Sequence, residues 1–133
     1  TFKFVKKSNY KKAGKNEMRY DMFDAEFTHI ADRCTFEVIV ESFDLKQAPL
    51  SVIAEIIHDL DLKDTKFNRP ETAGVGMFIN SLVSSEQSDE GRMKKANSLF
   101  DDLYRAIDVN LKAKPLKSNS KKIQAVTKVH LKP

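Results

Sequence analysis

One stripe of apolar residues constrains the fold of this chain more than any other feature. Between Ser88 and Pro115 the apolar side chains recur every three or four residues, at Met93, Ala96, Leu99, Phe100, Leu103, Ile107 and Leu111. That spacing places them on one face of an α-helix. Ser88, followed by Asp89 and Glu90, is typical of a helix N-terminus, and Pro115 cannot continue a helix. The sequence therefore predicts a long amphipathic helix that ends near Lys112 and buries one face.

Three earlier segments also have helical features. Arg33–Leu45 carries apolar residues at helical spacing, and Pro49–Leu60 begins with a proline suited to the first helical position. Pro70–Val83 is apolar nearly all round, which is typical of a helix at the buried centre of a domain. Gly74 and Gly76 lie inside this last segment, where we expect them to let another helix approach closely.

Short alternating segments predict a little β structure near the two ends. Thr1–Val5 alternates apolar and polar residues, and Gln124–Leu131 could pair with it or be disordered. Met18–Phe27 is a candidate for a further extended piece. The predicted fold is therefore mainly α: a single small domain of about four helices with short β segments near the termini. The domain is expected over residues 1–112, followed by a basic tail over 113–133.

Length and composition limit the class of protein. A chain of 133 residues that is 41% hydrophobic suits one domain with a modest core. No run approaches the roughly 18 apolar residues that span a bilayer, so no membrane contact is expected. A single cysteine cannot form an internal disulfide, which favours a reducing, cytoplasmic compartment. The chain starts with Thr1 rather than Met, which is consistent with a processed or truncated fragment.

Charge is distributed very unevenly along the chain. Residues 1–19 carry seven basic side chains and one acidic one, and residues 112–133 carry seven lysines and no acid. Residues 20–111 carry nine basic and eighteen acidic side chains, a net charge of −9. Basic ends of this kind serve solubility or fold back onto the acidic body; a surface for an anion or a nucleic acid is the alternative.

The first candidate site surrounds the lone cysteine. Cys34 follows His29 by five residues and precedes Glu37 by three. Asp32 and Thr35 indicate a helix start that places Cys34 in the first turn, where the helix dipole favours a thiolate. Nitrogen, sulfur and oxygen ligands together suit zinc, iron or another borderline ion. The alternative is a buried cysteine flanked by a surface histidine and a surface glutamate.

The second candidate site lies at the end of the second predicted helix. His58 and Asp61 are three residues apart, and Asp64 follows them. A carboxylate there could bind a metal or orient the imidazole. The alternative is that a protonated His58 simply complements the dipole at a helix C-terminus. Because both candidate sites lie at polar edges of apolar helices, they could converge across a helix–helix contact.

Other catalytic motifs are missing from the sequence. There is no G-x-S-x-G, P-loop or CxxC motif, and Gly74-Val75-Gly76 lacks the third glycine and preceding strand of a dinucleotide site.

Five sequence blocks, taken in order, resemble a known family. They are Phe27–His29, Asp32–Glu37, Ile53–Asp64, Arg69–Gly74 and Leu99–Tyr104. Together they resemble the ChrB-type chromate-resistance domain over about residues 20–105. The resemblance implies a bacterial protein linked to chromate resistance, whose relatives are stand-alone domains or the C-terminal part of a chromate-responsive regulator. Family members often carry an upstream Cys-Pro-Trp segment that has no counterpart here, so a site that used that cysteine would be incomplete.

The leading interpretation is a chromate-linked domain that binds a metal or carries out thiol redox chemistry. The predicted metal ligands are His29, Cys34, His58 and Asp61, for zinc, iron or manganese. Cys34 and Glu37 are the predicted catalytic pair, as nucleophile and proton acceptor, and Arg33 is expected to hold chromate or another oxyanion. One thiol supplies too few electrons to complete chromate reduction, so whether the domain is an enzyme stays open.

Two other interpretations compete with that one. The first is a sensor or regulatory module that binds an anion or a metal and signals to another domain or to DNA, with Cys34 as the switch. The second is a purely structural helical domain. The oligomeric state does not follow from the sequence.

Overall fold

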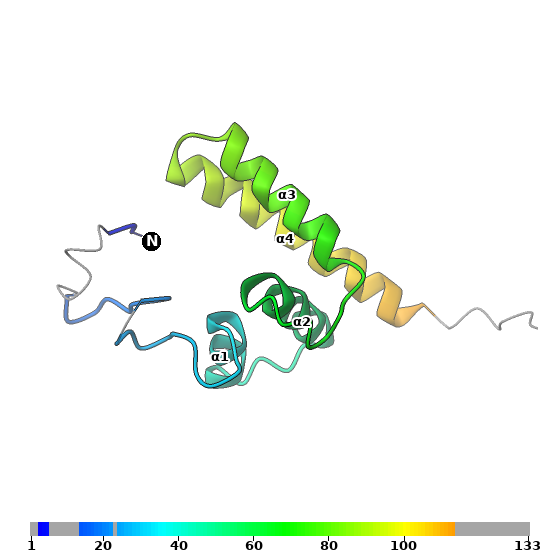
Figure 1. Cartoon of the computed structure of the whole chain (residues 1–133), viewed down its shortest axis with the longest axis horizontal. Helices are drawn as coiled ribbons and strands as arrows, with labels where there is room; N and C mark the ends of the chain where they lie inside the picture. The colour runs from blue at the N-terminus through cyan, green and yellow to red at the C-terminus, as the bar shows by residue number, and fades with distance from the viewer. Residues whose placement is uncertain (1–2, 6–13, 23, 114–133) are drawn as a thin grey trace, which may run out of the picture.

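The computed structural model describes residues 3–5, 14–22 and 24–113 (Figure 1). Their four helices are α1 (Thr35–Ser42), α2 (Ala48–Asp61), α3 (Thr72–Ser85) and α4 (Asp89–Lys112). The predicted mainly α fold with four helices is confirmed, and each predicted helix is found within about two residues of its predicted start.

The predicted β segments are not seen in the part of the chain that the structure describes. Residues 3–5 of Thr1–Val5 form no strand, and Gln124–Leu131 lies outside the described residues. Only two isolated bridges are present among the described residues, Tyr20 with Phe27 and Ile30 with Arg33. The first falls within Met18–Phe27, which is therefore a bridged loop rather than a strand.

Helix α2 is the centre of the packing. It contacts α1, α3 and α4, whereas α1 contacts α2 alone among these helices (Figure 1). The buried core joins α2, α3 and α4 through Ile53, Ile56, Val75 and Ile107. Pro49 lies at the start of α2, as predicted, where its missing N–H is not needed.

The prediction that the third helix is the buried centre of the domain is wrong. Val75 is the only buried residue of α3, and Met77 and Phe78 are 71% and 61% exposed. α3 packs through one face only, because α2 is the helix that has neighbours on several sides. The close approach expected of the glycines is confirmed at Gly76, where an added Cβ would lie 2.9 Å from Cδ2 of Leu60.

Helix α4 begins as the sequence predicts. The Ser88 hydroxyl accepts a hydrogen bond of 3.1 Å from the Gly91 N–H, so it caps the helix. The apolar stripe runs along the side facing α2 and α3 as far as Ile107, and Leu111 beyond it is exposed. Within the described residues, no helix is both long and apolar enough to cross a membrane.

Candidate functional site

A fully buried imidazole lies at the polar centre of the domain. His58, near the C-terminal end of α2, has no exposed surface. Its Nδ1 lies 2.6 Å from Oε2 of Glu37, and its Nε2 lies 3.1 Å from Oδ2 of Asp64. Burial opposes a charge on the ring, but the two carboxylates outweigh it and raise the pKa of His58 above its ordinary value. Both ring nitrogens face carboxylate oxygens, which only accept hydrogen bonds, so these contacts match an imidazolium that donates to both carboxylates.

Glu37 connects this imidazole to the start of α1. The same Oε2 that lies against His58 also accepts a 2.8 Å hydrogen bond from the backbone N–H of Cys34. Glu37 is the third residue of α1, so this is the carboxylate half of a capping box. One oxygen therefore satisfies the helix N-terminus and pairs with the buried charge.

Cys34 corrects one expectation from the sequence. It is the N-cap residue of α1 rather than a member of the first turn, and its side chain is completely buried. Burial raises the pKa of the Cys34 thiol, and the neighbouring Glu37 carboxylate raises it further. Desolvation and the nearby negative charge thus outweigh the backbone N–H groups of Phe36 and Glu37, which lower the pKa, and the thiol form is favoured over the expected thiolate.

His29 and Asp61 form a second, more exposed pair. Nε2 of His29 lies 3.0 Å from Oδ2 of Asp61 and 3.5 Å from Oδ1 of Asp21. The expectation that the two candidate sites converge is confirmed, because His29 meets Asp61 and Glu37 meets His58. However, His58 pairs with Asp64 instead of with Asp61, its neighbour one turn along α2.

The loop between α2 and α3 supplies Asp64 and is held by buried polar contacts. The carboxylate of Asp59 is buried and accepts hydrogen bonds from the N–H groups of Phe67 (3.0 Å) and Arg69 (2.9 Å). Lys63 and Thr65, on either side of Asp64, have positive φ angles of 55° and 56°. Such left-handed residues are strained unless the surroundings fix them. The Phe67 ring stands edge-on to the imidazole of His58, with centroids 4.9 Å apart.

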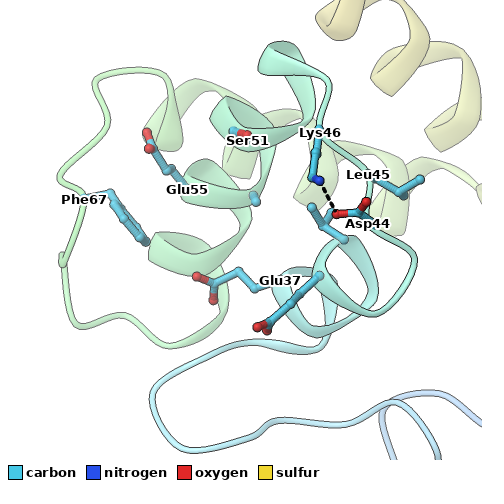
Figure 2. Close-up of a pocket in the computed structure, with 10 residues that line it drawn as sticks. Glu37, Asp44, Leu45, Lys46, Ser51, Glu55 and Phe67 are labelled. Atoms are coloured by element: carbon cyan, nitrogen blue, oxygen red, sulfur yellow. Dashed lines mark ion pairs between the residues drawn. The ribbon is translucent and has the colours of Figure 1, made fainter.

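An open groove of about 350 Å³ lies beside this network, between α1, the first part of α2 and the loop before α3 (Figure 2). Its charged lining is mostly acidic. The acids are Glu37, Glu41, Asp44 and Glu55, and the one lysine is Lys46, which pairs with Asp44 at 3.0 Å. Each of these acids already has a cationic partner, because Glu37 faces His58, Glu41 faces Arg33 and Glu55 faces Arg69.

Comparisons with known proteins agree with the blocks in the sequence. The family model described as "ChrB, C-terminal domain" matches residues 1–107. The chain belongs to the ChrB C-terminal domain family. It is 30% identical over 86 residues to Protein ChrB of Cupriavidus metallidurans, a stretch that covers 64% of this chain and 26% of that protein. The chain thus spans about a quarter of that relative, and no solved structure matches it.

Membership of the ChrB C-terminal domain family supports the association with chromate resistance that the five blocks imply. The match covers the whole of α1, α2 and α3 and most of α4. Every residue of the polar centre lies within it, and residues 113–133 of the predicted basic tail lie beyond it.

The predicted ligands and oxyanion-binding residue of this ChrB domain all have partners in the fold. His58 is held by two carboxylates, His29 pairs with Asp61, and Arg33 forms an ion pair with Glu41 on α1. Among the described residues, no three His, Cys, Asp or Glu side chains are grouped so that they could hold a metal ion. The four predicted ligands are therefore not grouped so that they could bind the same metal ion. A transition metal at these residues stays a prediction.

Asp64 and Phe67 are the members of the polar centre that sequence reasoning did not assign. Asp64 lies six residues after His58, which is farther than the three- or four-residue spacing that favours Asp61. The signal that could have found it is the helix end at Asp61, because the chain must turn back there and the next acid can then face the imidazole.

Proposed function

We propose that this chain is a regulatory module of a chromate-resistance system and that it does not itself reduce chromate. The observation that carries this proposal is the complete burial of the Cys34 thiol, with its raised pKa. The thiolate is the reactive form of cysteine, and the buried thiol is inert by comparison. At neutral pH the lone cysteine of this chain is therefore a poor nucleophile toward an oxidant.

The lack of an unpaired cation among the described residues of the groove lining supports the same proposal. Chromate is a dianion and needs a cation to bind it, but the one lysine of the lining, Lys46, is already paired with Asp44. The guanidinium of Arg33, which could have held an oxyanion, is engaged by Glu41. The lining of this groove, as far as the structure describes it, therefore offers chromate no free cation.

The arrangement of His58 also favours regulation over catalysis. A general base needs a ring nitrogen that is free to accept a proton. Both nitrogens of His58 lie against carboxylates, which favour the protonated ring and raise its pKa. What the imidazole does instead is join three segments: the N-terminus of α1, the end of α2 and the loop before α3. A displacement of one of these segments is therefore expected to alter the contacts of the other two.

The first experiment measures chromate reduction by the purified chain with an excess of a nicotinamide donor, after subtraction of the reduction by the donor alone. Reduction of chromate to trivalent chromium takes three electrons, and one thiol supplies one. We expect less than one equivalent of chromate reduced per chain. The Cys34→Ser variant is expected to lose only this amount, which the single thiol supplies. Many equivalents reduced by the wild type and lost in Cys34→Ser would contradict the proposal and favour an enzyme.

A second experiment tests the regulatory role in cells that depend on the full-length protein for chromate resistance. We expect Cys34→Ser to keep resistance and Glu37→Gln, which opens the buried network, to lower it. Glu41→Gln is the matched control, since Glu41 is exposed and touches Arg33 rather than His58. Unchanged resistance in a folded Glu37→Gln variant would refute a regulatory role for the network.

A further inference from the structure

We draw no further inference here: the strongest candidate, the uncharged surface of helix α3 around the exposed side chains of Met77 and Phe78, carries no proposal because nothing in the structure shows what covers it.

Discussion

Replacing Glu37 by glutamine tests the buried network most sharply, because one carboxylate oxygen serves two partners. In the Glu37→Gln variant the amide oxygen can still accept from the Cys34 N–H, but the buried imidazolium of His58 loses its closest counter-charge. Removing one partner of a buried ion pair costs about 3–5 kcal/mol, and a hydrogen bond to a charged group contributes about 1.5–3 kcal/mol. With 15% of the Glu37 side chain exposed, we expect a loss of about 2–3 kcal/mol near neutral pH.

The loss also has a predicted pH dependence. The folded-state pKa of His58 is raised above its ordinary value of 6.5. The stability that this protonation contributes is therefore complete below pH 6.5 and is lost as the pH rises through the folded-state value. The difference in unfolding free energy between wild type and Glu37→Gln is expected to be largest near about pH 6 and to shrink as the pH rises through the folded-state pKa of His58.

Urea denaturation followed by circular dichroism at several pH values measures this difference. Glu41→Gln removes a carboxylate from the exposed ion pair with Arg33 and is expected to cost no more than about 1 kcal/mol at any pH. A Glu37→Gln loss that is the same at low and high pH, or no larger than that of Glu41→Gln, would refute the assignment of a buried imidazolium.

Three further predictions follow from single contacts. Ring ¹⁵N shifts in NMR, assigned with His58→Gln, are expected to show the His58 ring more than half protonated at pH 6.5; a mostly neutral ring at that pH contradicts the raised pKa. Asp59→Asn weakens an acceptor of two backbone N–H groups, so we expect a loss of about 1–3 kcal/mol and faster proteolysis of the loop after α2; protection equal to wild type argues against this anchor. Gly76→Ala places a Cβ 2.9 Å from the end of the Leu60 side chain, which must shift, so in thermal or urea unfolding it is expected to gain less stability than Gly74→Ala, which lies in open space and stabilises by up to about 1 kcal/mol; equal effects contradict the packing of α2 on α3.

The helices of this fold are largely predictable because their signals are local. These signals are the apolar residues at helical spacing, Pro49 near the start of α2 and Ser88 at the N-cap of α4. Each acts within one or two helical turns. Which helix lies at the centre is not local. The apolar composition of α3 suggested burial, but α2 contacts the other three helices and α3 keeps one face outside.

The sequence predicts most residues of the candidate site, but not which of them pair with one another. The lone cysteine with His29 before it and Glu37 after it marked one group, and helical spacing marked His58 and Asp61; the meeting of the two groups follows from the contact of α1 with α2. Spacing could not show that a loop returns Asp64 to the imidazole. Nor could it show that burial at the N-cap outweighs the helix dipole at Cys34, since both effects depend on what packs above the helix end.

The pH dependence of Cys34 alkylation by iodoacetamide in the native chain tests the central claim most directly. Cys34 is the only cysteine, so every alkylated chain reports on that thiol. The account predicts slow alkylation near neutral pH that accelerates only above the ordinary thiol range, and fast alkylation once urea unfolds the chain. Rapid alkylation of the folded chain at neutral pH would show an accessible thiolate, contradict the regulatory proposal and restore thiol redox chemistry as the function.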